Sequence, residues 1–161
     1  MAPHTAAYTL LLLGHVGCAV VGFGSVAISA VFAAAVPAGP TGPRAEGVRR
    51  YFAPGLNWAG RLLYGVPVLG FALLAASRGA FDDGDAFVVA GLVLWAAAAV
   101  VAEAVVWPAE RRIQQVVSVR WERTLSDAPH VVARDCRLVT GGAVVLLAVF
   151  VVATVLMVGK P

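Results

Sequence analysis

Four long apolar runs dominate the pattern of hydrophobic and polar positions. They cover residues 6–36, 56–76, 86–107 and 139–158, and the charged residues gather between them. A helix needs about 20 apolar residues to cross the hydrocarbon core of a bilayer. Because lipid offers the backbone no hydrogen-bond partner, such a run satisfies its own polar groups as a helix. The pattern therefore predicts an all-α, polytopic membrane protein, a four transmembrane helix bundle that forms a single membrane domain over residues 1–161.

Prolines mark the expected helix boundaries. The first run is followed by a segment with three prolines at residues 37–43, which cannot continue a helix. Pro67 lies in the middle of the second run and is expected to kink it. Pro108 directly follows the third run and is expected to end it. Residues 108–134 would then form a connector outside the membrane.

This connector has an apolar stripe of its own. Between residues 109 and 126 the apolar side chains recur every four positions, at Ile113, Val117, Trp121 and Leu125. Such spacing predicts an amphipathic helix. It would either lie on the membrane surface or extend the third helix as a stalk. Its apolar stripe suits a plain surface connector or a docking site for a partner protein.

The composition supports a lipid environment. Hydrophobic residues make up 60% of the 161 residues and charged residues only 13%, whereas a soluble domain carries about 25% charged residues. The net charge of +3 is small, and no segment interleaves basic and aromatic residues in the way that nucleic-acid-binding surfaces do. We expect the lipid bilayer as the main partner, other membrane subunits or further copies of this chain as protein partners, and no nucleic acid.

The charges between the apolar runs predict the orientation. Basic residues concentrate after the first run and after the third, whereas the segment after the second run is acidic. Cytoplasmic loops of membrane proteins carry the excess of Lys and Arg. The first and third loops are therefore expected in the cytoplasm, and both termini outside. Trp58 and Trp107 would then lie at the cytoplasmic interface, where aromatic residues are common.

The first predicted helix has one face of small or polar residues. These residues recur every three or four positions: His15, Cys18, Gly22, Ser25 and Ser29. Small residues allow membrane helices to approach closely, and Ser hydrogen-bonds across the contact. One interpretation is a helix-packing face that points into the bundle. The other is the lining of a cavity for a cofactor or substrate.

His15 is the sharpest single candidate for chemistry. An ionisable residue inside a membrane is costly and often functional, and a neutral imidazole is a good axial ligand of haem iron. His15 is thus a candidate cofactor-binding residue for haem b, although His4 and His130 lie outside the apolar runs and only Met157 has a plausible depth for a second ligand. The other interpretation is a histidine that hydrogen-bonds to a neighbouring helix.

Two further observations concern charged residues and cysteines. Arg61 and Glu103 each lie inside the predicted cytoplasmic end of a helix, so they are expected to form an intramembrane ion pair. The pair either fixes helix packing or belongs to a proton or anion path. Cys18 and Cys136 fall at different predicted depths, which predicts two free thiols. No phosphate-binding loop, zinc-ligand spacing or nucleophile elbow is present, so we expect no catalytic residues and no metal site.

The chain resembles a group of bacterial predicted integral membrane proteins of unknown function. The resemblance rests on Leu13-Gly14-His15-Val16-Gly17, on Gly22-Phe23-Gly24 and on the ending Met157-Val158-Gly159-Lys160-Pro161. It implies four helices, an early histidine in the first of them and a place in the bacterial plasma membrane. More distantly, the early histidine is similar to that of copper-resistance permeases and bacterial protoporphyrinogen oxidase, and the latter likeness would make His15 a haem ligand.

The sparse polar interior and the short outer loops favour one function class over the others. We expect a non-enzymatic accessory or assembly subunit of a larger membrane complex. The alternative is a haem-binding or redox membrane protein that uses His15. A transporter subunit is a weaker alternative, because four helices this apolar leave little room for a pore.

Overall fold

The computed structural model of the chain describes residues 6–39, 42–77, 84–127 and 129–159, and of residues 118–131 the backbone alone. The described residues form helices and turns, with no strand among them. Four helical stretches are long and apolar enough to cross a membrane: Ala6–Ala38, Trp58–Ala76, Ala86–Val117 and Val132–Gly159. The prediction of an all-α chain with four membrane-spanning helices is confirmed at this level.

The first stretch consists of α1 (Ala6–Ala35) and a 3₁₀ turn, η1 (Val36–Ala38). It ends where the sequence predicts, because Gly39 adopts a left-handed conformation with φ of 59° and donates its N–H to the carbonyl of Val36. The short helix α2 (Gly42–Tyr51) follows, with Pro43 in its first turn. The sequence pattern did not predict α2, because this segment has no apolar run.

The second stretch combines α3 (Trp58–Arg61), the 3₁₀ turn η2 (Leu62–Tyr64) and α4 (Gly65–Ala76). The tight turn η2 lies just before Pro67, which has no N–H to donate to the carbonyl of Leu63. The helix changes from 3₁₀ to α geometry just before Pro67, and the kink expected at this proline stays a prediction.

The third stretch continues well beyond its predicted end. It consists of α5 (Ala86–Val101), the π-helical turn η3 (Ala102–Val106) and α6 (Trp107–Asp127), which follow one another without a gap. The prediction that Pro108 ends this helix is wrong. In η3 the N–H of Trp107 reaches the carbonyl of Ala102, five residues back, and this wider turn accommodates a proline that lacks an N–H of its own.

The last helix, α7 (Pro129–Gly159), also begins earlier than predicted. The described part of the connector 108–134 is therefore helical and belongs to α6 and α7, and the choice between a surface helix and a stalk stays a prediction. Ile113 and Val117 of its apolar stripe are buried. Trp121 and Leu125 belong to the residues whose side chains the structure does not describe.

The chain divides into two compact units. Unit 1 comprises Met1–Ser25, Trp58–Ala99 and Leu147–Pro161, and unit 2 comprises Val26–Asn57 and Val100–Leu146. The helices α1 and α7 each contribute residues to both units.

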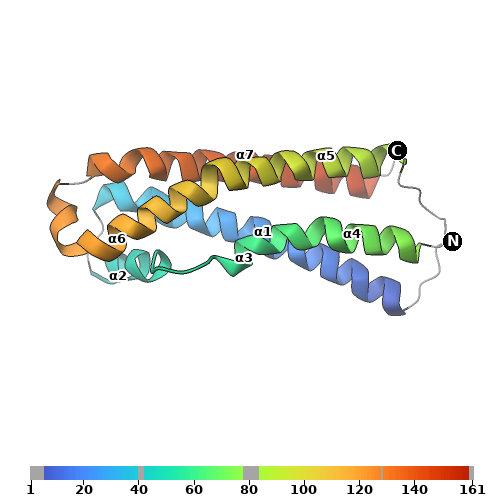
Figure 1. Cartoon of the computed structure of the whole chain (residues 1–161), viewed down its shortest axis with the longest axis horizontal. Coiled ribbons are helices and arrows are strands. Elements are labelled where there is room, and N and C mark those ends of the chain that lie inside the picture. The colour runs from blue at the N-terminus through green and yellow to red at the C-terminus, as the bar shows by residue number, and fades with distance from the viewer. Residues whose placement is uncertain (1–5, 40–41, 78–83, 128, 160–161) are drawn as a thin grey trace. The chain divides into compact units, whose positions relative to one another are not determined.

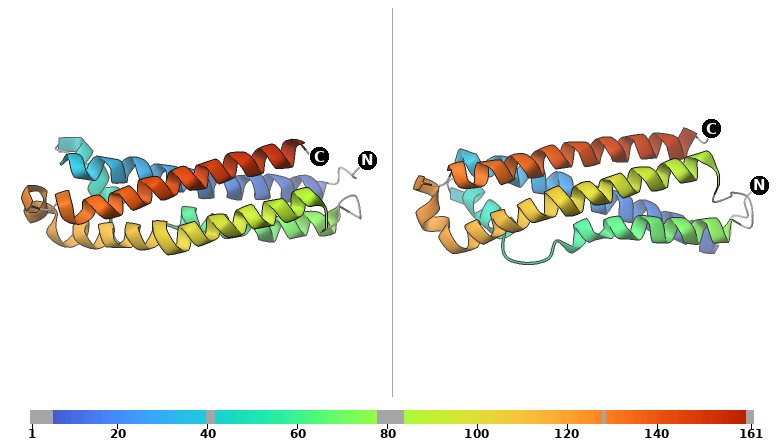
Figure 2. Two further views of the ribbon diagram at one scale, coloured as in Figure 1. Left: turned by 90° about the horizontal axis from the view of Figure 1, so that it is seen from above. Right: turned by 45° about the horizontal axis from the view of Figure 1, so that its top comes forward.

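In unit 1, α4 runs beside the first part of α1, and α5 runs beside the last part of α7 (Figures 1 and 2). Phe23 of α1 and Phe150 of α7 bring their ring centroids to 4.9 Å. All four helical stretches of this unit also carry exposed large apolar side chains, including Leu10, Val68, Val93 and Val155. Such side chains suit contact with lipid.

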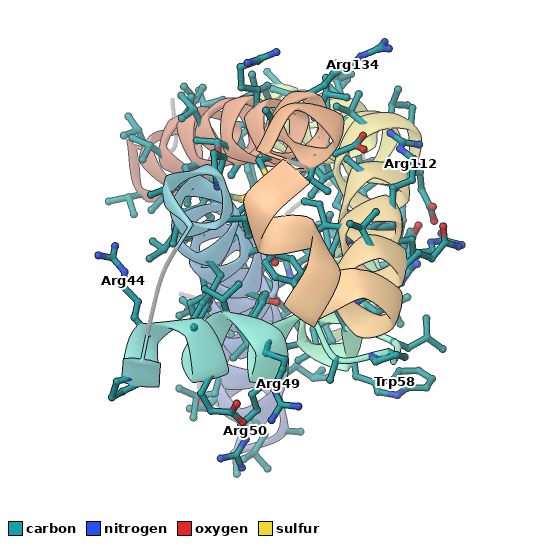
Figure 3. All side chains as sticks on the ribbon, turned by 90° about the vertical axis from the view of Figure 1, so that its left-hand side faces the viewer. Arg44, Arg49, Arg50, Trp58, Arg112 and Arg134 are labelled. Atoms are coloured by element: carbon teal, nitrogen blue, oxygen red, sulfur yellow. The ribbon has the colours of Figure 1, made fainter. Side chains whose placement is uncertain are left out.

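In unit 2, α2 packs against α6 around a core that includes Val48, Phe52, Ile113 and Leu146, each at most 1% exposed. The arginines of this unit whose side chains the structure describes lie outside the core. Figure 3 shows the side chains of Arg44, Arg49, Arg50, Arg112 and Arg134 pointing away from the ribbon. Trp107 is buried, so it cannot contribute to an aromatic belt at the lipid interface, whereas Trp58 of unit 1 is exposed.

Candidate functional site

His15 lies on α1 against the second helical stretch of unit 1. Its Nδ1 is 2.9 Å from the backbone carbonyl of Val66. Because a carbonyl oxygen only accepts hydrogen bonds, Nδ1 must carry a proton, and in the neutral imidazole Nε2 then has the lone pair. The ring lies beside Gly70, where a Cβ would be 3.4 Å from Cε1 of His15, at ordinary van der Waals contact. His15 is thus hydrogen-bonded through Nδ1 to a neighbouring helix.

Cys18 and Gly22, on the same face of α1 as His15, also lie close to the second stretch. A Cβ at Gly22 would lie 2.9 Å from the backbone nitrogen of Leu63, a distance that real Cβ atoms essentially never show. A Cβ at Gly65 would lie 2.7 Å from Sγ of Cys18. Glycine at these two positions therefore allows α1 to approach the second stretch to within backbone contact.

The remaining residues of the face are buried serines. Ser25 belongs to unit 1 and is 8% exposed, and Ser29 belongs to unit 2 and is 1% exposed. The structure therefore places His15, Cys18 and Gly22 against one neighbouring segment, while Ser29 has separate partners in unit 2. Cys18 and Cys136 are free thiols, as predicted.

The other predicted residues divide between the two units, with Arg61 and Met157 in unit 1 and Glu103 in unit 2. Arg61 is half-buried in unit 1, whereas Glu103 is exposed in unit 2, so their ion pair stays a prediction. Met157 packs against α5, where a Cβ at Gly91 would lie 2.7 Å from its Cε. The residue His4 and the side chain of His130 lie outside the described part of the chain. Among the described residues, no group of three or more His, Cys, Asp or Glu side chains is arranged to hold a metal ion.

Unit 2 contains a buried polar cluster that the sequence analysis missed. Glu110 of α6 is only 5% exposed, and its Oε1 accepts hydrogen bonds from Oγ of Ser29 at 3.2 Å and from Nδ2 of Asn57 at 3.3 Å. Oγ of Ser29 also lies 2.5 Å from Oη of Tyr51 at the end of α2. Segments far apart in the sequence thus meet at one carboxylate. We call these four residues the Glu110 cluster.

A signal for this cluster was present in the sequence. Glu110 lies three residues before Ile113 and seven before Val117, which places it on the apolar stripe of the connector. A carboxylate on an apolar stripe predicts a buried polar contact. The signal was missed because Pro108 was taken as the end of the membrane helix, so the stripe was traced only from Ile113 onward.

No protein-family model, curated protein or solved structure matches the chain. The resemblance to bacterial integral membrane proteins of unknown function therefore stays a prediction. The architecture is that of a multi-pass membrane protein, and the function has to be argued from the two units themselves.

Proposed function

We propose that this protein is an accessory or assembly subunit of a larger membrane complex, without catalysis of its own. The observation that carries the proposal is the close helix packing in unit 1. At Gly22 and Gly65 the helices approach so closely that even a methyl group would collide with a neighbouring atom. At these positions α1 and the second stretch leave no room between them, which favours a function on the outer surface of these helices.

The outer surface offers apolar faces for neighbouring helices. On α1 the side chains of Leu13, Val16 and Val20 are exposed, and on α5 so is Val93. Membrane helices associate by close packing of complementary faces, since lipid is as apolar as these side chains. These faces suit lipid, a partner subunit or a second copy of the chain.

The test is to isolate the protein at its native level from mild-detergent extracts of its own membrane. We expect it to migrate as part of a complex, with partner proteins in fixed stoichiometry, and we expect deletion of the protein to reduce the amount of that complex. A protein that migrates alone, and whose deletion leaves every membrane complex intact, would refute the accessory function.

We also propose the orientation with both termini outside, which rests on the arginines of unit 2 and on the acidic segment near residue 84. Single cysteines are introduced at Gly84 and at Ala53, two exposed positions, in a chain with Cys18→Ala and Cys136→Ala. A membrane-impermeant thiol reagent added outside intact cells is expected to label position 84 and not position 53. The reverse pattern contradicts the orientation.

A second candidate function, haem binding at His15, is favoured by the tautomer of this residue. The hydrogen bond from Nδ1 to the carbonyl of Val66 leaves Nε2 with its lone pair, the arrangement in which histidine ligates a metal. When bound, haem b would supply one-electron chemistry, and His15 would hold it, with Met157 as the candidate for a second ligand.

The visible spectrum of the purified protein tests this alternative. Haem binding predicts a stoichiometric Soret band that shifts on reduction and is lost in His15→Ala. The matched control is His4→Ala, which removes a histidine expected to lie before the membrane and should leave the band unchanged. A colourless protein, or a band that His15→Ala leaves intact, would exclude His15 as the haem ligand.

A further inference from the structure

The Glu110 cluster plays no part in either function above. We propose that Glu110 is a site that binds a proton reversibly, and that the hydroxyl groups of Ser29 and Tyr51 form the relay through which the proton reaches it. The proposal rests on the burial of the carboxylate, on the direction of its hydrogen bonds and on the position of Tyr51 at the edge of the membrane-spanning helices.

Because Glu110 is buried, its ionised form costs more free energy than its protonated form does. The residue is 5% exposed and lies near the end of the long apolar stretch Ala86–Val117, just before the exposed Arg111 and Arg112. An ionised carboxylate away from water is costly, and binding a proton removes that cost.

The fold turns Glu110 inward by means of η3. The π turn takes in one residue more than an α turn, so it corrects the rotation of the buried stripe just before α6 begins. As a result, Ala102, Val106, Glu110 and Ile113 all lie on the buried side of one continuous helix. π turns of this kind are frequent at functional sites.

The hydrogen bonds in the cluster have a defined direction. Ser29 donates its hydroxyl proton to Oε1 of Glu110, so its contact with Tyr51 must use the oxygen of Ser29 as acceptor. Tyr51 is therefore the donor to Ser29, and the chain of donors runs from Tyr51 through Ser29 to Glu110. Asn57 donates to the same carboxylate oxygen and holds it in place.

In the proposed relay, Tyr51 is the member through which protons enter from water. It is the last residue of α2, and α2 lies outside all four candidate membrane stretches. The residue is half-buried, whereas Ser29 is 1% exposed. Its ring is held by Phe32, which stacks on it at a centroid distance of 4.4 Å, and by the edge-on contact of Phe52 at 5.1 Å.

Proton uptake through this relay is balanced at every step. The Oγ–H bond of Ser29 breaks as a new O–H bond forms on Oε1 of Glu110. The proton of the Tyr51 hydroxyl moves to Oγ of Ser29, and a hydronium ion in the adjoining water restores the Tyr51 hydroxyl. One proton leaves the water and one arrives on Glu110, and each hydroxyl ends as it began. Release follows the same steps in reverse.

The other titratable groups in the described part of unit 2 differ from Glu110 in burial or partners. On α2, Glu46 and Arg49 pair with each other at the surface, and Arg44 and Arg50 are exposed. Four groups on η3, α6 and α7 are exposed: Glu103, Arg111, Arg134 and Arg137. Nε of Arg112 lies 2.8 Å from Oδ1 of Asp135. The side chain of Cys136 is buried. Val26–Ala38 on α1 and η1 contributes no titratable group. Glu110 is thus the one buried carboxylate among these described groups.

Infrared difference spectroscopy of the full-length protein in lipid nanodiscs tests the proposal, with spectra taken at low and at high pH. Protonated Glu110 should give a carbonyl stretching band of a buried carboxylic acid, which appears on acidification, shifts in D₂O and is lost in Glu110→Gln. The matched control is Glu103→Gln, which alters an exposed carboxylate on the same continuous helix and should leave the band intact. A band that survives Glu110→Gln, or no band at any pH, overturns the proton site.

Two further variants test the relay and cover the case in which Glu110→Gln fails to fold. Ser29→Ala keeps the carboxylate but removes one hydrogen-bond donor, so it should shift the frequency of the band. Tyr51→Phe should keep the band and slow its appearance several-fold after a pH jump. An unshifted band in Ser29→Ala contradicts the assignment to Glu110, and an unchanged rate in Tyr51→Phe contradicts the relay.

Discussion

The indole N–H of Trp95 on α5 donates a hydrogen bond of 2.9 Å to the backbone carbonyl of Leu63 in η2. In a regular α-helix this carbonyl would accept from the N–H of residue 67, which is the proline of α4. A side chain of another helix thus supplies a donor where the proline removes one. The ring of Trp95 also meets Tyr64 edge-on, at a centroid distance of 6.4 Å.

Replacing this donor should destabilise unit 1. Trp95→Phe keeps an aromatic ring but removes the N–H, so the carbonyl of Leu63 loses a hydrogen bond in apolar surroundings. We expect the free energy of unfolding to fall by about 1 kcal/mol, measured by reversible denaturation in mixed micelles.

A double-mutant cycle provides the control for Trp95→Phe. Pro67→Ala restores a backbone N–H four residues after Leu63, so in this background the loss of the indole should cost less. Equal losses in the presence and in the absence of Pro67 would show that the indole does not act through this carbonyl.

Gly22 should tolerate no side chain. In Gly22→Ala the new Cβ would lie 2.9 Å from the backbone nitrogen of Leu63 and 3.2 Å from its Cα, and backbone atoms cannot turn away as a side chain can. We expect a loss of about 1–3 kcal/mol in the free energy of unfolding. Gly17→Ala is the matched control on α1, because its Cβ would meet nothing within 4 Å, and it should be neutral or slightly stabilising. Equal effects of the two variants would contradict the close approach at Gly22.

Gly142 should behave as one half of a packing pair in unit 2. A Cβ at this position of α7 would lie 2.5 Å from Cγ2 of Val106 in η3, so Gly142→Ala should destabilise the protein. Val106→Ala removes the colliding methyl group, and the double variant should recover part of the stability that Gly142→Ala loses. Gly141→Ala, with nothing within 4 Å, is the control. Strictly additive effects of Gly142→Ala and Val106→Ala would refute the pairing.

The ion pair on α2 predicts a pH effect of defined sign. The hydrogen bond from Arg49 holds the pKa of Glu46 below its ordinary value of 4.5, with the charges of Arg49 and Arg50 acting in the same direction. A lowered pKa in the folded state means that the pair supports α2 at neutral pH and that this support is lost as the pH falls through the lowered pKa. Arg49→Gln should return the pKa of Glu46 towards 4.5, as followed by NMR titration of the carboxyl carbon. An unchanged pKa would contradict the role of Arg49.

The membrane helices could be predicted from the sequence because their lengths and their apolar character are local properties. A run of apolar residues without charges forms a helix in lipid whatever its neighbours are. Gly39, at the end of the first stretch, is equally local, since its left-handed conformation needs no tertiary contact. The boundary at Pro108 was predicted wrongly, because a proline interrupts a helix only where the surrounding turn cannot widen to accept it.

The candidate site was only partly accessible to sequence reasoning. The spacing of His15, Cys18 and Gly22 shows that they share a face, but not which helix they meet or that Val66 accepts a hydrogen bond from His15. The Glu110 cluster depends on more distant relationships, since its residues lie on four separate segments between positions 29 and 110.

The sequence by itself determined the number of helices long and apolar enough to cross a membrane, their approximate positions and their lipid surroundings. All three follow from the hydrophobicity of contiguous residues. Only the tertiary structure decided which polar groups face one another. The π turn of η3 rotates Glu110 into the core of unit 2, and Ser29, Tyr51 and Asn57 meet it there. The physical reason is that burial in lipid is a property of each segment, whereas a buried carboxylate persists only where several segments bring their donors to it.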